Sequence, residues 1–163
     1  MFVQGERYKV LIGEYKHQLD DKSRLRLPYK LRREFTNGYV ISRGTNGCLF
    51  VFSQEEINRI IEKVKLLPLS DISAWKPMRY ILSSATEIEE DTQGRFVLPT
   101  NLIEFSGIEK CAVIIGAGTH AEIWSEEKWN SYTLGSENKD STSQEKFAES
   151  FDNIISDLKN YGI

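Results

Sequence analysis

The chain has 163 residues, 40% of them hydrophobic, and a formal net charge of −3, which is compatible with one ordinary domain or two small domains of a soluble globular protein. Its longest apolar runs, residues 48–52 and 111–115, are far shorter than the roughly 20 residues that span a bilayer, and residues 1–7 lack the apolar stretch of a signal peptide. These features argue against a membrane span or a membrane partner, and we expect a cytoplasmic protein.

Two blocks of sequence occur twice, in the same order. Residues 20–28 and 91–99 both read Asp-x-x-x-Arg-x-x-Leu-Pro, and residues 51–55 resemble residues 123–127. Internal repetition of this kind indicates that one structural unit is used twice. The predicted divisions are an N-terminal extension, repeat 1, linking helices, repeat 2, and a linker with an amphipathic C-terminal helix: residues 1–12, 13–57, 58–84, 85–129 and 130–163.

Each repeat is expected to begin with two strands joined by a polar turn. The first strand is predicted at residues 14–19 and, in repeat 2, at 86–90. The second, at 25–27 and 96–98, alternates apolar and other residues and stops at a proline that suits the first position of a short helix. Because an Asp side chain can bond to its own backbone, we expect the Asp-x-x-x-Arg motif to form the turn of a hairpin.

A second hairpin closes each repeat. In repeat 1, strands at residues 39–41 and 49–52 flank Asn46-Gly47, a dipeptide that strongly indicates a hairpin turn. The corresponding strands of repeat 2 are predicted at 113–115 and 121–124. Strand pairs of this length are marginal alone in water, so we expect the two repeats to interlock and several chains to associate.

Helices are predicted between and after the repeats. Ser53 and Glu56 have the pattern of a capping box at the start of an amphipathic helix. Residues 70–84 form a second predicted helix, which Pro77 is expected to kink or split. After Leu134 a polar linker leads to a third predicted helix. Its apolar stripe consists of Phe147, Phe151, Ile154, Ile155 and Leu158.

Charge is distributed unevenly along the chain. Residues 16–33 hold seven Lys or Arg and two Asp, a net charge of +5, so the rest of the chain carries −8. An acidic body with one basic segment can steer a polyanion to one face of the protein. This distribution argues for a nucleic-acid partner in spite of the negative net charge.

Neither the cysteines nor the histidines have the spacing of a metal or catalytic site. Cys48 and Cys111 lie far apart in apolar segments, and we interpret both as core residues. His17 and His120 are isolated in strand-like segments. His17 flanks the predicted hairpin of the basic segment, so a phosphate contact is an alternative role for it.

Several further segments, together with the repeated motif, resemble the MraZ family of bacterial transcriptional regulators. They are Gly13-Glu14-Tyr15, Leu67-Pro68-Leu69-Ser70, Ala85-Thr86-Glu87-Ile88 and Glu122-Ile123-Trp124-Ser125. The resemblance extends from about residue 12 to residue 132. The chain departs from the family pattern in the additional residues 1–11, in Ser23 where a Gly is usual, and in Pro77.

The resemblance implies a fold, an assembly and a function. The fold is α+β, mainly β, with two tandem swapped-hairpin barrel units of the SpoVT-AbrB type and short helices. The assembly is a ring-shaped homo-oligomer that binds tandem direct repeats in double-stranded DNA upstream of the cell-division and cell-wall operon, and is therefore associated with the nucleoid. No cofactor, metal, small-molecule substrate or enzymatic activity is implied.

The repeated motif also has a chemical interpretation. Arginine offers a planar fork of donors that fits phosphate or guanine, and a turn held by Asp projects that fork from rigid strands. The predicted DNA-binding residues are Arg24, Arg95, Lys22 and Arg26, and the predicted turn-supporting residues are Asp20 and Asp91.

Two observations leave a structural role open, particularly for repeat 2. An Asp–Arg pair on a solvated surface contributes about 0–1 kcal/mol and needs no ligand to explain it. In addition, a run of carboxylates precedes Arg95 and would repel a phosphate. These carboxylates belong to Glu87, Glu89, Glu90 and Asp91.

Three other interpretations compete with DNA binding. Residues 116–121 match the dinucleotide pattern Gly-x-Gly-x-x-Ala, but the segment after them is predicted as a strand instead of a helix. Asp20 and Asp91 could form an aspartic-protease dyad, but Lys22 would disturb the proton that such a dyad shares. The alternative that we retain is an antitoxin-like interaction module whose C-terminal helix binds a protein partner.

Overall fold

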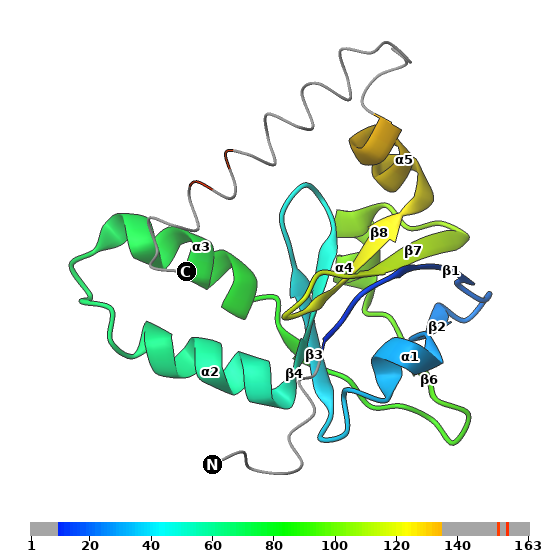
Figure 1. Ribbon diagram of the computed structural model, residues 1–163, viewed down its shortest axis with the longest axis horizontal. Helices are drawn as coiled ribbons and strands as arrows, with labels where there is room; N and C mark the ends of the chain where they lie inside the picture. Colours follow the sequence, from blue (N-terminus) through cyan, green and yellow to red (C-terminus); the bar gives the residue numbers. More distant parts are fainter. Residues whose placement is uncertain (1–9, 135–152, 154–155, 157–163) are drawn as a thin grey trace. The chain divides into compact units, whose positions relative to one another are not determined.

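The computed structural model describes residues 10–134 together with residues 153 and 156. Contacts divide the chain into a unit of residues 1–129 and a unit of residues 130–163. The first unit contains a six-stranded antiparallel sheet, a separate two-stranded ribbon and several helices (Figure 1). The chain is therefore α+β and mainly β, as predicted.

The elements of the two repeats follow the same order. Repeat 1 contributes β1 (Glu14–Gln18), β2 (Arg24–Arg26), α1 (Tyr29–Arg32), β3 (Tyr39–Arg43) and β4 (Leu49–Ser53). Repeat 2 contributes β5 (Thr86–Glu87), β6 (Arg95–Val97), α4 (Thr100–Ser106), β7 (Cys111–Gly116) and β8 (Ala121–Ser125). The other helices are α2 (Gln54–Val64), α3 (Ile72–Leu82) and α5 (Glu126–Leu134).

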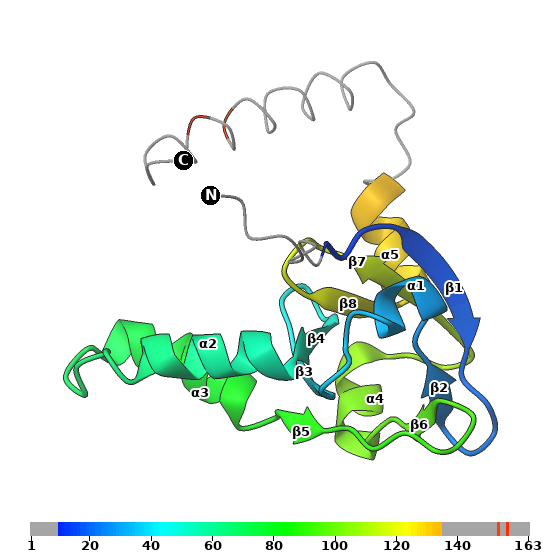
Figure 2. The same cartoon turned by 60° about the horizontal axis from the view of Figure 1, so that its bottom comes forward.

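Strands of one repeat pair with strands of the other. The large sheet has the order β1-β7-β8-β4-β3-β5, so the first strand of each repeat extends the second hairpin of the other. Strands β2 and β6 lie side by side and form the ribbon (Figure 2). The hairpin expected around each Asp-x-x-x-Arg turn is therefore wrong, since the strands before and after the turn lie in different sheets. Pairing across the repeats places these short strands in one shared core, which a local two-stranded hairpin cannot build.

An approximate twofold axis relates the two repeats. In the ribbon, Leu25 pairs with Phe96, which is its counterpart at an offset of 71 residues. In the sheet, Phe50 of β4 pairs with Glu122 of β8, its counterpart at an offset of 72. An antiparallel pair in which a residue faces its own counterpart must have the axis between its strands. The axis consequently passes through the ribbon and through the centre of the large sheet.

The largest hydrophobic cluster joins the ribbon to the large sheet. Leu25 and Phe96 point into it from β2 and β6, and they are only 1% and 2% exposed. Burying side chains of this size stabilises the fold by about 1.5–3 kcal/mol each. Because side chains alternate along a strand, their neighbours in the ribbon must point outward. From the large sheet the cluster includes Ile41, Leu49, Val51, Ile114 and Ile123.

Both predicted second hairpins are confirmed. Strands β3 and β4 are joined by a turn in which Asn46 and Gly47 have φ of 54° and 76°, and the Cys48 amide donates to the Thr45 carbonyl at 3.0 Å. These left-handed conformations at both central residues are those of a type I′ turn. Strands β7 and β8 form the other hairpin. The segment after residues 116–121 is thus a strand, which removes the context that a dinucleotide site needs.

Helices α2 and α3 lie side by side and contact β4 and β3 (Figures 1 and 2). Helix α2 begins where predicted, and the Ser53 hydroxyl accepts a hydrogen bond from the Glu56 amide at 3.1 Å. Pro77 lies inside α3 and the helix is continuous, so of the two predicted outcomes the split is wrong and the kink stays a prediction. A proline removes one backbone hydrogen bond, and α3 keeps its N-cap, in which Asp71 accepts from the Ala74 amide at 3.1 Å.

The two cysteines differ in burial. Cys48 is in the core as predicted, and burial raises the pKa of its thiol to about 12. Cys111 is only half-buried, so its assignment to the core is wrong. It occupies the first position of β7, in the strand paired with the edge strand β1, where one side chain can remain accessible to solvent. Burial raises its pKa as well.

All five residues of the predicted C-terminal stripe, within 147–158, lie outside the described residues. Of this range the structure describes Asn153 and Ser156, which are both helical. Among the described residues, no helix combines the length and the apolar content needed to cross a membrane.

Candidate nucleic-acid interface

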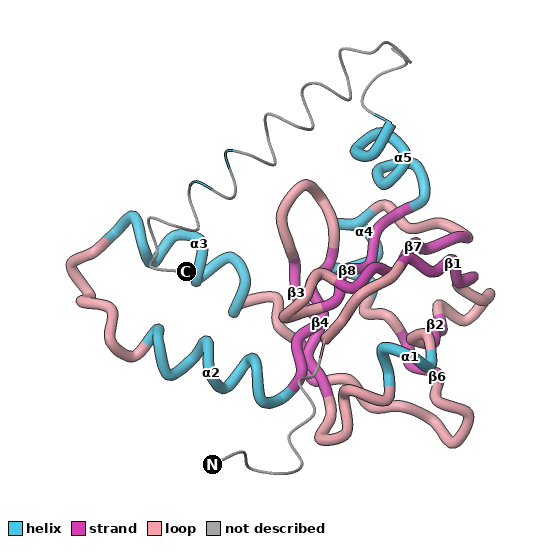
Figure 3. Tube along the Cα trace, viewed as in Figure 1, coloured by secondary structure: helices cyan, strands magenta, loops and turns pink. Residues whose placement is uncertain are grey.

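A loop held by Asp20 leads from β1 into β2 (Figure 3). Asp20 Oδ1 accepts hydrogen bonds from the backbone amides of Lys22 and Arg24 at 2.9 and 2.8 Å. Asp20 Oδ2 accepts from Arg24 Nε at 2.7 Å. Ser23 adopts a left-handed φ of 58°. One carboxylate therefore closes the loop and orients the arginine that follows it.

The loop before β6 repeats this arrangement. Asp91 Oδ1 accepts from the backbone amides of Gln93 and Arg95, both at 2.9 Å, and Asp91 Oδ2 accepts from Arg95 Nε at 2.9 Å. Gly94 takes the left-handed position, with φ of 76°. The backbone hydrogen bond from the arginine residue is the main cause that lowers the pKa of Asp20 and of Asp91. Both carboxylates are consequently charged at neutral pH.

The two arginines project from one face of the ribbon. Arg24 pairs with Val97, and Arg26 pairs with Arg95. Their neighbours Leu25 and Phe96 point into the core, so these four side chains form the opposite face of the ribbon, which we call the outer ribbon face. Arg95 lies on the neighbouring strand, two residues from the residue that faces Arg24, so the Cα atoms of the two arginines are about 8 Å apart.

Each guanidinium group on this face keeps donors available for a ligand. Arg24 and Arg95 use Nε for the Asp, and within the described residues their terminal nitrogens make no hydrogen bond. The two side chains are 26% and 29% exposed. Arg26 is exposed and faces Arg95 across the ribbon, where like charges repel each other unless an anion lies between them. The face therefore has the chemistry of an anion-binding surface.

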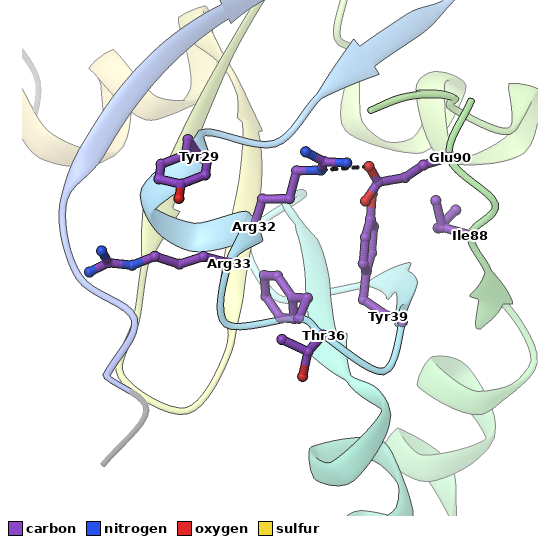
Figure 4. A pocket seen from close by; sticks show the side chains of 9 residues that line it. Tyr29, Arg32, Arg33, Thr36, Tyr39, Ile88 and Glu90 are labelled. Atoms are coloured by element: carbon purple, nitrogen blue, oxygen red, sulfur yellow. Dashed lines mark hydrogen bonds and ion pairs between the residues drawn. The ribbon is translucent and has the colours of Figure 1, made fainter. Parts of the chain in front are cut away.

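Arg32 of α1 supports the second loop from the other repeat. Its Nε donates to Glu90 Oε2 at 2.6 Å, and Figure 4 shows the guanidinium group directed at that carboxylate. A Cβ at Gly94 would lie 2.8 Å from Arg32 Cζ, so this loop packs directly on the guanidinium group. The hydroxyl end of Tyr39 points to the same carboxylate, and burial together with Glu90 raises the pKa of Tyr39. Sequence reasoning did not identify Arg32, because its partner lies 58 residues away.

This support changes the charge around Arg95. Of the four carboxylates that precede it, that of Glu90 is paired with Arg32 and that of Asp91 with Arg95 itself. Glu87 lies in β5, at the far edge of the large sheet, and Glu89 is exposed. Two of the four expected repulsive charges are thus compensated. The cavity beside this ion pair has a volume of about 460 Å³ and is lined partly by Tyr29, Arg33 and Ile88 (Figure 4).

The two histidines are not brought to the outer ribbon face. His17 is half-buried in β1. His120 lies in the loop that joins β7 to β8. Its Nε2 is 3.1 Å from Glu122 Oε2, and its ring packs against Phe50 with centroids 4.8 Å apart. Among the described residues there is no cluster of three or more His, Cys, Asp or Glu side chains that could hold a metal ion.

Fold and site together define a duplicated α+β protein whose repeats present arginines on one shared ribbon. The chain matches the MraZ family model, described as an MraZ protein, antitoxin-like, over residues 10–76 and 81–153. It is 42% identical over 154 residues to the transcriptional regulator MraZ of Heliobacterium modesticaldum, covering 94% of this chain and all of the relative. The MraZ regulators of Syntrophomonas wolfei and Clostridium beijerinckii are 41% and 45% identical over 86% and 76% of this chain, and 95% and 87% of their own lengths. The chain belongs to the MraZ family.

Proposed function

We propose that the chain is a sequence-specific, DNA-binding transcriptional regulator and that the β2–β6 ribbon enters the major groove. The observation that carries the proposal is the pair of identically held arginines on the outer ribbon face. The major groove is about 12 Å wide and admits a two-stranded ribbon. The regulators named MraZ that align over most of this chain support the functional class.

In this proposal each residue of the motif has a distinct role. Asp20 and Asp91 accept hydrogen bonds from the loop backbone and from Nε of the arginine that follows. The terminal nitrogens of Arg24 and Arg95 then face the DNA, and these side chains lose little rotamer freedom on binding. Guanine O6 and N7, or a phosphate, accept from such a fork in a bidentate manner. Lys22 and Arg26, both exposed, add contacts in repeat 1.

The assembly that we propose is a ring of several chains, each with two interlocked swapped-hairpin barrel units of the SpoVT-AbrB type. The pairing of β1 with β7, of β5 with β3 and of β2 with β6 supports the interlocking. A ring places ribbons at regular spacing, and linked copies on tandem direct repeats raise the apparent affinity by roughly 10²–10⁴. We propose that these repeats lie upstream of the cell-division and cell-wall operon and that the protein is cytoplasmic and associated with the nucleoid.

Binding to a duplex from upstream of the chain's own gene tests this function. Gel-shift and fluorescence-anisotropy titrations should give an affinity that falls steeply with salt, because each phosphate contact contributes about −0.9 to the slope of log K against log salt. A scrambled duplex of equal composition is the control for sequence preference. A flat salt response or equal affinity for both duplexes would contradict the proposal. Size-exclusion chromatography should show a particle several times the 18.8 kDa chain.

The antitoxin-like description of the family model favours a second candidate, a module whose C-terminal segment neutralises a protein partner. Residues 135–163 carry six acidic and three basic residues, a composition suited to a basic partner. Deleting this segment separates the two candidates. If the chain is a DNA-binding regulator, DNA binding should survive the deletion. An interaction module would lose its protein partner on deletion and would show no DNA preference either before or after the deletion.

A further inference from the structure

Val97 occupies the fourth position on the outer ribbon face. It pairs with Arg24 across the ribbon and lies two residues beyond Arg95 on the same strand. Val97 is 61% exposed, among the more exposed large hydrophobic residues described. The counterpart of Val97 in repeat 1 is Arg26, so the approximate twofold axis relates an apolar side chain to a charged one.

We infer that Val97 determines sequence specificity by contacting the C5 methyl group of a thymine, an inference that rests on the proposed entry of the ribbon into the major groove. The edges of the bases in that groove present hydrogen-bonding groups and one apolar group, the thymine methyl. A guanidinium fork matches guanine O6 and N7, while an exposed branched aliphatic side chain has no polar atom to offer. The methyl group is the feature of the groove that such a side chain complements.

The register of the ribbon places this contact relative to the arginines. Side chains that face each other directly in an antiparallel pair have Cβ atoms about 4.5–5.5 Å apart. Successive base pairs are about 3.4 Å apart along the helix. The thymine read by Val97 therefore lies within about two base pairs of the base read by Arg24.

The same register makes the two halves of the recognised element different. In a symmetric ribbon, position 26 would hold an apolar residue like its counterpart Val97, but it holds Arg26. Arg26 selects a hydrogen-bond acceptor, whereas Val97 selects a methyl group. The DNA element recognised by this face is consequently asymmetric, so the ribbon binds it in one orientation.

Removing single methyl groups from the DNA tests the inference. In the duplex from upstream of the chain's own gene, each thymine is replaced in turn by deoxyuridine, at the same place in every repeat. The wild-type protein should bind about fourfold less tightly per contact when the thymine facing Val97 is replaced, which is the effect of losing one buried methyl-sized group. Replacements elsewhere should leave the affinity unchanged.

Protein variants assign the effect to the side chain. Val97→Ser should bind the thymine and deoxyuridine duplexes equally, whereas Val97→Ile should keep the wild-type difference. The matched control is Val10→Ser, which changes a valine of similar exposure, 56%, and should also keep the difference. Since Val97 is exposed, none of these changes should move the melting temperature beyond a few degrees.

The outcomes separate this inference from the proposed function. A protein that binds the upstream duplex without sensitivity to any deoxyuridine overturns the inference and leaves the function standing. So does a difference that persists in Val97→Ser. If Val97→Ser instead changes the oligomer size with no change in thymine preference, Val97 is a contact between copies and the inference is overturned. A wild-type protein that binds no duplex overturns both.

Discussion

The loops of repeat 1 and repeat 2 are alike in geometry and unlike in charge. Each Asp accepts the same three hydrogen bonds, and the arginines are almost equally exposed. Residues 20–33, however, hold six basic and two acidic side chains, a net charge of +4, whereas residues 91–104 hold one basic and two acidic, a net charge of −1. The geometry of the loop and the electrostatic field around it are therefore independent of each other. An identical loop can therefore contribute unequally to binding.

The largest expected effect comes from removing one arginine at a time. Arg24→Ala should weaken binding to the upstream duplex by about 100-fold and Arg95→Ala by about 10-fold, because a bidentate base contact is worth about 1–3 kcal/mol and Arg24 lies in the positive half. Anisotropy titrations measure both. Neither variant should melt more than a few degrees below wild type, and an unfolded Arg24→Ala protein would show that the residue is a structural ion pair. Equal losses of affinity in the two variants would contradict the unequal contribution of the two repeats to DNA binding.

Giving repeat 2 the charges of repeat 1 should have the next largest effect. Gln93→Lys combined with Val97→Arg places cations at the counterparts of Lys22 and Arg26. The slope of log K against log salt should become steeper by up to about 2 per bound chain, and affinity for scrambled DNA should rise about tenfold. The control is Glu62→Lys, which adds the same charge on the exposed side of α2. A control that behaves like the double variant would mean that net charge, and not the ribbon, is responsible.

Removing the support of the second loop should weaken binding less, by about three- to fivefold. Arg32→Ala leaves the Glu90 carboxylate uncompensated near Arg95 and removes the surface on which Gly94 packs. Adding Glu90→Gln should restore part of the affinity, because the repulsive charge is then absent. Arg33→Ala is the matched control, since it removes a neighbouring guanidinium group that does not contact Glu90. DNA titrations of the wild type and these three variants check the prediction. If Arg32→Ala loses affinity and the double variant recovers none of it, the uncompensated charge of Glu90 is not the cause of the loss.

Acid should weaken both loops by a small and similar amount. The folded state lowers the pKa of Asp20 and Asp91, so it binds these protons less readily than the unfolded chain does. The resulting stabilisation is complete above the unfolded pKa of about 4 and is lost as the pH falls through the folded value. Between pH 5 and pH 3 the wild type should lose more melting temperature than Asp20→Asn combined with Asp91→Asn. Parallel pH profiles would show that the two carboxylates do not stabilise the fold.

Most of the local structure could be predicted from the sequence. The Asn46-Gly47 turn and the Ser53 cap depend on neighbouring residues, and both are as expected. Interlocking of the repeats could be expected from the short strands, but the partner of each individual strand could not be predicted. The hairpin assigned to each motif loop is wrong because strand partners are selected by the shared core.

The candidate site divides in the same way. The repeated motif identified Arg24, Arg95 and their Asp partners, whereas Arg32 and the neighbourhood of Val97 are visible only when the two repeats are placed against each other. The same contact pairs the carboxylate of Glu90, one of those that precede Arg95, with the Arg32 guanidinium group.

The amino-acid sequence is enough to show that one unit is written twice, where the Asn46-Gly47 turn and the Ser53 cap occur, and that positive charge is concentrated in the first copy. The fold was needed to show which strands the copies exchange and that their arginines share one ribbon face. Turns, caps and alternation arise from neighbours along the chain, whereas strand partners are selected by which apolar faces can be buried together, and that depends on both copies at once.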